Sequence, residues 1–167
     1  MPPFIIQKEN PILRQSAEAV PQESITTPKI QSVLQVMSAA LASADDGVAL
    51  AAPQIGESLQ IFIVAGKMIN EETPPPDLVF INPKIIKMSR TKKVMEEGCL
   101  SVRWIYGHVK RAERVSVEAY DRDGKKFVHH GSGLLAQIFQ HEMDHLSGTL
   151  FIDKATDMQE IKPESVQ

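Results

Sequence analysis

The sequence predicts an α+β fold in which mainly antiparallel β-sheets pack around a central helix that carries an H-E-x-x-H motif. Three observations support this prediction. A helical apolar pattern follows Thr27-Pro28, several strand patterns come after it, and a second helical pattern surrounds His141 to His145. Helical and strand patterns do not alternate as they do in βαβ folds, so a mainly parallel sheet is not expected.

The first half of the chain contains one helix between two short strands. The apolar run Phe4 to Ile6 predicts an edge strand, and Leu59 to Ala65, rich in β-branched and aromatic residues, predicts a buried one. Thr27 is typical of a helix N-cap and Pro28 of the first helical position, and residues 45–47 should end this helix. Its apolar positions are Ile30, Val33, Leu34, Met37, Ala40 and Leu41.

Strands dominate the middle of the chain. Residues 66–77 are polar and contain three consecutive prolines, which indicates an exposed loop. Residues 78–88 read as one strand, or as two that are broken at Asn82-Pro83. Residues 115–128 predict a β-hairpin, because Val115, Val117 and Ala119 alternate with polar residues and the turn signal Asp121-Arg122-Asp123-Gly124 follows.

The motif helix comes last. Ser132 is a candidate cap, and Gly148 marks the end of the helix. The polar tail 154–167 should be frayed or only briefly helical. We expect residues 1–167 to form a single metallohydrolase domain, since this length supports one core. The apolar positions of the motif helix are Leu134, Leu135, Ile138, Phe139 and Leu146.

Composition narrows the class of protein. A net charge of −3 gives no reason to expect stable nucleic-acid binding through a basic surface. No apolar run is long enough to cross a membrane, and no signal peptide is apparent. The single cysteine, Cys99, excludes an internal disulfide and fits a reducing compartment. The expected location is the cytoplasm, or an organelle if a transit peptide has been removed.

The H-E-x-x-H motif indicates a metal site. The four-residue spacing places His141 and His145 on one helix face, where both rings can bind one ion, and Glu142 lies beside it as a proton acceptor. Hydrolytic zinc usually has a third protein ligand. Glu160 and Glu164 are downstream candidates, and Cys99 is an upstream one, although a lone cysteine is more often a small buried apolar residue. His108, His129 and His130 are expected to be surface or packing residues.

Three segments together resemble the motifs of peptide deformylases. Gly47 to Gly56 resembles their G-φ-G-φ-A-A-x-Q motif, Glu97 to Ser101 is similar to E-G-C-L-S, and Gln140 to Leu146 is similar to Q-H-E-x-D-H-L. Their order and approximate spacing also agree with the family. Arg111 and the Tyr120 to Gly124 hairpin add support to the resemblance.

The resemblance implies the reaction and the cofactor. Members of this family remove the formyl group from the N-terminal formylmethionine of new polypeptides and release formate, with metal-bound water as the nucleophile. It implies that Cys99, His141 and His145 hold one divalent metal ion, which is expected to be Fe(II), while Zn(II), Ni(II) or Co(II) can substitute. The implied partners are N-formylmethionyl nascent peptides, and transient ribosome contact is left open.

The resemblance also implies roles for the remaining site residues. Glu142 is expected to act as base and then acid, while the Gln54 side chain and the Leu100 backbone N–H donate to the oxyanion. From the sequence alone, Leu134 and Ile138 would be ordinary core residues; the resemblance makes them pocket walls instead. The expected substrate-binding residues are Val48, Ala49, Leu50, Gly98, Leu134 and Ile138.

Some residues depart from the family pattern. Ala49 replaces a glycine beside the substrate, Arg103 replaces a proline after the E-G-C-L-S run, and Gln137 is polar where an apolar residue is common. These changes bear on substrate preference and rate. The tail also lacks the basic C-terminal helix that some members use at the ribosome.

Two other functions are compatible with parts of the sequence. The first is a zinc endopeptidase that uses His141, His145 and a downstream acid. The second is an inactive protein that binds formylated peptides, in which Ala49 and Arg103 mark the loss of activity. The retention of Gln54, Cys99, Glu142 and both histidines argues against the second alternative.

Overall fold

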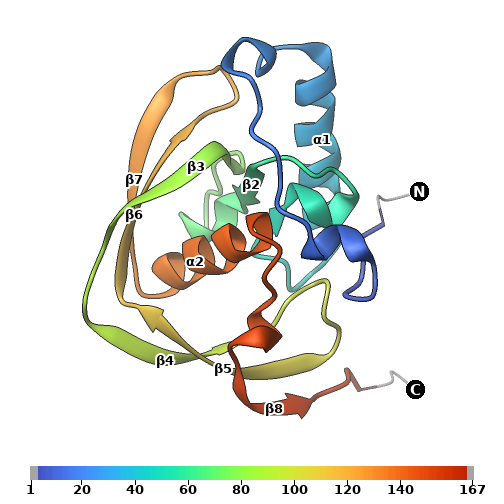
Figure 1. Ribbon diagram of the computed structural model, residues 1–167, viewed down its shortest axis with the longest axis vertical. Helices are drawn as coiled ribbons and strands as arrows, with labels where there is room; N and C mark the ends of the chain where they lie inside the picture. The colour runs from blue at the N-terminus through green and yellow to red at the C-terminus, as the bar shows by residue number, and fades with distance from the viewer. Residues whose placement is uncertain (1–3, 165–167) are drawn as a thin grey trace.

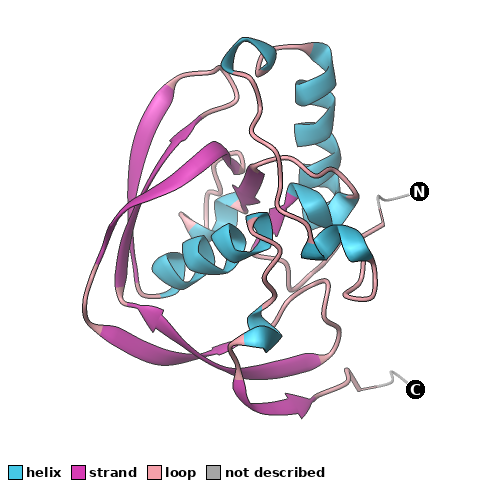
Figure 2. Cartoon of the chain, in the orientation of Figure 1, coloured by secondary structure: helices cyan, strands magenta, loops and turns pink. Residues whose placement is uncertain are grey.

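The computed structural model describes residues 4–164 of the chain. It confirms the α+β class: two antiparallel sheets curve around a central helix, and a second helix packs against the other side of the larger sheet (Figures 1 and 2). The helices are α1 (Pro28–Ala42) and α2 (Leu134–Leu146). No helix within 4–164 is long and apolar enough to cross a membrane.

The strands form two sheets in which all neighbouring strands are antiparallel. The larger sheet has the order β1-β2-β3-β6-β7, and the smaller one has the order β4-β5-β8. The larger sheet contains β1 (Ala49–Ala51), β2 (Ile61–Val64), β3 (Leu78–Met88), β6 (Arg114–Tyr120) and β7 (Lys126–Ser132). The smaller sheet contains β4 (Lys92–Glu97), β5 (Ile105–Ala112) and β8 (Thr156–Glu160).

Alternation along β2 explains why the larger sheet has a helix on each face. Successive side chains of a strand point to opposite faces. Ile61 and Ile63 therefore pack with the apolar face of α1, while Phe62 and Val64 pack with α2. All four side chains are fully buried. Strand β2 is apolar on both faces because both of its faces are covered.

An aromatic cluster anchors α2 to the sheet. The rings of Phe62 and Phe80 stack with their centroids 4.5 Å apart, and Phe139 of α2 meets Phe80 edge-on at 5.2 Å. Aromatic pairs in such geometries contribute about 1 kcal/mol each beyond the area they bury. The helix that carries the H-E-x-x-H motif is thus held firmly against a rigid sheet.

Several sequence predictions hold in the structure, with small shifts of boundary. Thr27 is the N-cap of α1 and Pro28 its first residue, although the helix ends at Ala42, before the predicted stop at 45–47. The strand predicted for residues 78–88 is the continuous strand β3. The strand predicted over residues 59–65 shortens to β2, and the predicted hairpin is formed by β6 and β7.

Other predictions were wrong. Phe4 to Ile6 forms no strand. Ser132 does not cap α2 but ends β7, and the N-cap is Gly133, whose positive φ of 59° suits glycine. The polar tail is ordered over β8, which pairs with β5, and residues 165–167 lie outside the described part of the chain. Strands β4 and β5 were not predicted at all.

Candidate metal centre

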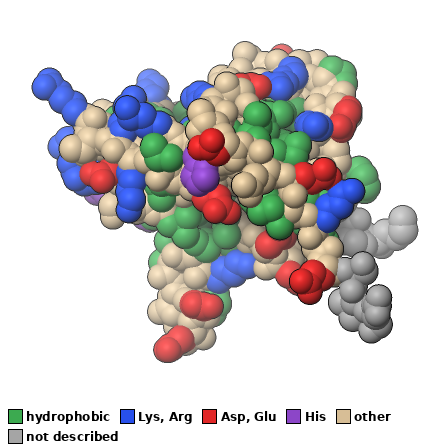
Figure 3. Space-filling view, turned by 90° about the horizontal axis from the view of Figure 1, so that it is seen from below, with side chains coloured by type: hydrophobic (Ala, Val, Ile, Leu, Met, Phe, Trp, Pro, Cys, Tyr) green, Lys and Arg blue, Asp and Glu red, His purple; other side chains and the backbone are tan. Residues whose placement is uncertain are grey.

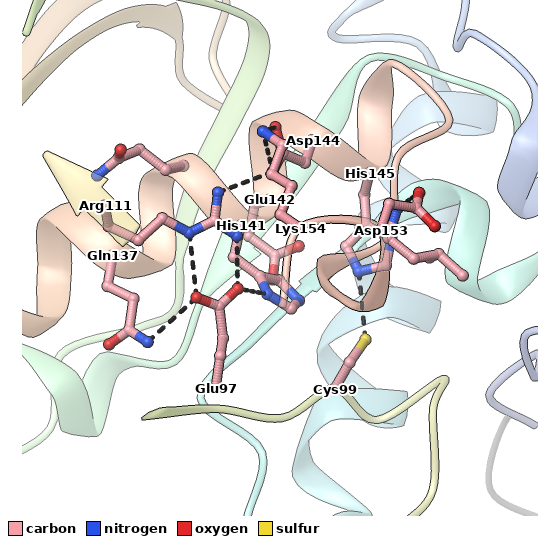
Figure 4. Close-up of polar contacts among 12 residues, drawn as sticks. Glu97, Cys99, Arg111, Gln137, His141, Glu142, Asp144, His145, Asp153 and Lys154 are labelled. Atoms are coloured by element: carbon pink, nitrogen blue, oxygen red, sulfur yellow. Dashed lines mark hydrogen bonds and ion pairs between the residues drawn. The ribbon is translucent and has the colours of Figure 1, made fainter. Parts of the chain in front are cut away.

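The two histidines of the motif lie on one face of α2, as their spacing predicts. The ring centroids of His141 and His145 are 5.0 Å apart, and the rings meet edge to face (Figure 4). His145 is fully buried, and His141 borders a cavity. The two imidazoles can therefore both face an ion between the helix and the loop that follows β4.

Cys99 completes the cluster from that loop. Its Sγ lies 3.3 Å from Nε2 of His145, and the candidate ligand atoms of Cys99, His141 and His145 all lie within 4.8 Å of one another. Within residues 4–164 these three form the one group of His, Cys, Asp and Glu side chains with such geometry. The downstream acids Glu160 and Glu164 are exposed in the tail and are not part of it, which contradicts the alternative third ligands.

Glu97 was not predicted as a site residue, yet it determines how His141 is held. The Nδ1 atom of His141 donates to Glu97 Oε1 at 2.5 Å, which leaves Nε2 to face the cluster. A histidine that ligates a metal usually donates its other ring N–H to such an acceptor. In the sequence, the acidic residue two positions before Cys99 was the feature that could have indicated this role.

A buried arginine supports Glu97. Arg111 donates from Nε and Nη2 to the two carboxylate oxygens of Glu97, at 3.0 and 2.6 Å. Burial disfavours the charged carboxylate, but the hydrogen bonds from His141 and Arg111 more than offset this and lower the pKa of Glu97 to about 2. Glu97 is therefore an anion behind the histidine.

The network extends in both directions from this ion pair (Figure 4). Arg111 Nη1 donates to Asp144 at 2.8 Å, and Asp144 also accepts from Lys154 at 3.1 Å. On the other side, Gln137 donates to Glu97 at 3.2 Å and to the backbone oxygen of Glu96 at 2.8 Å. Residue 137 is polar because its side-chain amide donates a hydrogen bond to the buried Glu97 carboxylate.

Glu142 has a buried, unpartnered carboxylate oxygen beside the cluster. The residue is 3% exposed, and its Oε2 has no hydrogen-bond partner within residues 4–164. Burial raises the pKa of Glu142 to about 7. A carboxyl group with this pKa can accept a proton and return it near neutral pH.

The charge distribution suits a cation. Burial disfavours a charged His141 ring, but hydrogen bonds with Cys99 and Glu97 raise its pKa well above the usual value. Burial, followed by the charge of His141, holds the pKa of His145 well below its usual value. A cation bound here would take the place of the proton that the raised pKa favours on His141, and a donor set of one sulfur and two imidazoles suits Fe(II), Co(II) or Zn(II) better than Mg(II).

Gln54 and Leu100 approach the cluster from two different segments. Gln54 Oε1 accepts from the Ala51 N–H at 2.9 Å, which orients the amide so that Nε2 points to the site. There Nε2 donates to Ser101 Oγ at 2.9 Å and lies 3.7 Å from Cys99 Sγ. The Leu100 N–H donates to no protein acceptor within residues 4–164.

A cavity of about 290 Å³ opens beside the cluster. Its wall includes Cys99, His141 and Glu142, so a molecule in the cavity reaches the candidate metal site. Of the predicted substrate-binding residues, Leu50 alone does not line it, because its side chain is fully buried in the core between α1 and the sheet. Those that do line it are Val48, Ala49, Gly98, Leu134 and Ile138.

An ion pair closes one side of the cavity mouth. Arg103 donates to Asp46 at 2.8 Å and lies over the Trp104 ring, 4.3 Å from its centroid. All three residues line the cavity. This pair joins the loop after α1 to the loop that carries Cys99. The residues beyond the E-G-C-L-S run therefore form part of the entrance.

The remaining histidines lie outside the cluster, as expected. His129 contacts the aromatic core with its ring 5.6 Å from that of Phe139, and His130 hydrogen-bonds Ser116. His108 is exposed on β5. None of the three lines the cavity.

An α+β fold around an H-E-x-x-H helix, with a free cysteine and a buried, unpartnered carboxyl group beside the two histidines, places the chain in the class of metal-dependent hydrolases. Comparison with known proteins is more specific. Residues 3–160 match the family model for polypeptide deformylases. The chain belongs to the peptide deformylase family, whose members remove the formyl group from the N-terminus of new polypeptides.

Individual peptide deformylases are similar to this chain along most of their length. The chain is 39% identical over 152 residues to a peptide deformylase of Desulforudis audaxviator, covering 91% of this chain and 92% of that one. A crystal structure of a peptide deformylase from Legionella pneumophila superposes with a TM-score of 0.82 at 38% identity, covering 92% and 85% of the two chains. One from Synechococcus elongatus in complex with actinonin gives 0.82 at 35% identity, covering 94% and 81%.

Proposed function

We propose that the chain forms a single domain that deformylates N-formylmethionyl peptides. In this proposal Cys99, His141 and His145 bind one divalent cation, and Glu142 transfers the protons. The observation that carries this proposal is the convergence of three ligand atoms within 4.8 Å beside the unpartnered Glu142 carboxylate. We propose Fe(II) as the physiological ion, with Zn(II), Ni(II) or Co(II) as substitutes, since this donor set accepts all four.

A cation held there would polarise the formyl carbonyl and make a water molecule easier to deprotonate. Glu142 accepts the proton as the water oxygen attacks the formyl carbon. The carbonyl oxygen becomes an oxyanion, to which Gln54 Nε2 and the Leu100 N–H donate, each contributing about 3 kcal/mol of transition-state stabilisation. Glu142 then returns the proton to the leaving amine as the C–N bond breaks, and formate departs.

The cavity supports recognition of the methionine side chain. Val48, Leu134 and Ile138 supply apolar walls, and a flexible thioether fills such irregular space well. The peptide backbone would pair along residues 47–50, using main-chain hydrogen bonds that do not depend on sequence. Leu50 would contribute its backbone only, since its side chain is in the core.

Two further proposals concern the setting of the reaction. The free thiol of Cys99 must stay reduced to act as a ligand, so we place the enzyme in a reducing compartment, the cytoplasm in a bacterium. Because the substrate is a nascent chain, we also propose transient contact with the ribosome.

The test is formate release from formyl-Met-Ala-Ser by protein reconstituted with Fe(II) under low oxygen. We expect wild-type protein to turn over. Glu142→Ala should retain its metal and lose nearly all activity, because the cation stays bound while the proton carrier is gone. Wild-type turnover in this variant would show that Glu142 is not the proton carrier. Metal-loaded wild-type protein that binds the formylated peptide without releasing formate would support the inactive binding protein instead.

A further inference from the structure

Charge is distributed very unevenly along this chain. The segment 78–95, which spans β3 and the start of β4, has five Lys and Arg residues and no Asp or Glu. Since the whole chain carries −3, the remainder carries −8. We call segment 78–95 the basic ribbon. The net charge of the whole chain is small because the rest of the chain is acidic, so the net charge alone gave no indication of a basic surface.

The cations of the basic ribbon are exposed and free. In Figure 3, Lys and Arg side chains gather at the left end of the molecule, on the side where β3 leads into β4 in Figure 1. Within residues 4–164, none of them lies in an ion pair. Glu118, opposite Lys84 in the sheet, is already paired with Lys126 at 3.1 Å. The five residues are Lys84, Lys87, Arg90, Lys92 and Lys93, and the neighbouring exposed cations Lys110 and Arg114 extend the group.

A second cavity, of about 390 Å³, opens at the edge of the basic ribbon. Among the described residues, no Asp or Glu lines it. Ser116 and His130 share a hydrogen bond of 2.6 Å on its wall, and the Ser116 side chain is buried. Cations and hydroxyl groups around one concavity match the oxygens of a phosphodiester group. The polar residues on its wall are Lys87, Ser89, Arg114, Ser116, His130 and Ser132.

We propose that the basic ribbon and this cavity bind the phosphodiester backbone of structured RNA and so dock the enzyme on the ribosome. The inference rests on the proposed function, because the nascent substrate emerges from a particle rich in RNA. A membrane surface is a weaker match. The exposed apolar residues Ile86, Met88 and Val94 are few, and the cavity wall carries two cations and three serines.

Two charge-reversal variants of the full-length, metal-loaded enzyme test this proposal. The first, Lys87→Glu with Arg90→Glu, changes the basic ribbon. The second, Lys29→Glu with Lys125→Glu, makes the same change of net charge at exposed positions elsewhere. The probes are a fluorescent RNA hairpin and purified bacterial ribosomes, with affinities measured over a series of KCl concentrations. Vesicles that contain phosphatidylglycerol serve as the comparison surface.

We expect the ribbon variant to lose at least about tenfold in affinity for both probes, and its slope of log K against log[KCl] to be shallower by about 2. The control variant should stay within about threefold of wild type, because its substitutions are remote from the ribbon. Turnover of formyl-Met-Ala-Ser should be unchanged in both variants, which separates this proposal from the proposed function.

Three outcomes would overturn the docking proposal. One is wild-type protein that binds neither probe, and another is an equal loss in both variants. The third is binding to vesicles that contain phosphatidylglycerol without binding to RNA, which would indicate a membrane surface as the partner of the ribbon.

Discussion

Glu97 Oε1 lies 2.5 Å from His141 Nδ1, so a buried carboxylate sets the orientation of a candidate metal ligand. The same carboxylate is held by Arg111. The geometry of the site thus depends on a contact between the end of β4 and the middle of α2. Glu97 is therefore a positioning residue, and replacing it should change the affinity of the site for metal.

Replacing Glu97 should weaken metal binding without removing any ligand. Glu97→Gln keeps the shape of the side chain but loses its charge, and changes to such partners typically reduce metal affinity about 10- to 100-fold. Zn(II) affinity measured by competition with a chelator would check this. The control is Glu96→Gln, because Glu96 is exposed and its side chain lies outside the network. Equal affinities for the two variants would contradict the positioning role.

The pair of Glu97 and Arg111 should be strongly coupled in stability. Arg111→Met removes the cationic partner that binds both carboxylate oxygens of Glu97, and breaking a buried pair in this way typically costs about 3–5 kcal/mol of unfolding free energy. Adding Glu97→Gln to Arg111→Met should recover part of the loss. Urea denaturation of the metal-free proteins would measure both variants. Additive losses in the double variant would show that the two residues are not coupled.

Gly98 should be intolerant of a side chain because of Tyr106. A Cβ at position 98 would lie 2.6 Å from Tyr106 Cε1, far inside van der Waals contact. We expect Gly98→Ala to cost about 1–3 kcal/mol of unfolding free energy, as overpacking does. The cost should shrink in a Tyr106→Leu background, where the crowding ring is gone. An unchanged cost in that background would contradict the steric explanation.

The ion pair at the cavity mouth should affect substrate choice more than stability. Arg103→Ala removes the contact with Asp46, and we expect an unfolding free energy within about 1 kcal/mol of wild type, because Asp46 is exposed. We expect kcat/KM to rise several-fold for formyl-Met peptides with a bulky second residue, and to change little when that residue is alanine. A uniform change across both peptides would contradict a role in specificity.

The sequence was sufficient to predict α2 and the two histidines, because a helical period and a four-residue spacing are local patterns. Strands β4 and β8 could not be predicted in this way. Lys92–Glu97 and Thr156–Glu160 are exposed over nearly their whole length, so they show no apolar alternation. They are strands because each pairs with β5, a contact between distant parts of the chain.

In the candidate site, too, local sequence motifs could be predicted and contacts between distant residues could not. Cys99, His141 and His145 belong to short motifs and were found from them, whereas the roles of Glu97 and Gln137 depend on contacts across 40 or more residues. Leu50 illustrates the reverse case. It lies within a motif, but the alternation of β1 turns its side chain into the core. Residue pattern alone does not distinguish a wall residue from its buried neighbour.

X-ray absorption at the zinc edge of zinc-loaded protein identifies the ligands of the bound ion. We expect one ion per chain, with one sulfur ligand at about 2.3 Å and two imidazole nitrogens at about 2.0–2.1 Å. Cys99→Ser should remove the sulfur signal. A wild-type spectrum with only nitrogen and oxygen ligands, or one that Cys99→Ser leaves unchanged, would show that Cys99 does not bind the ion.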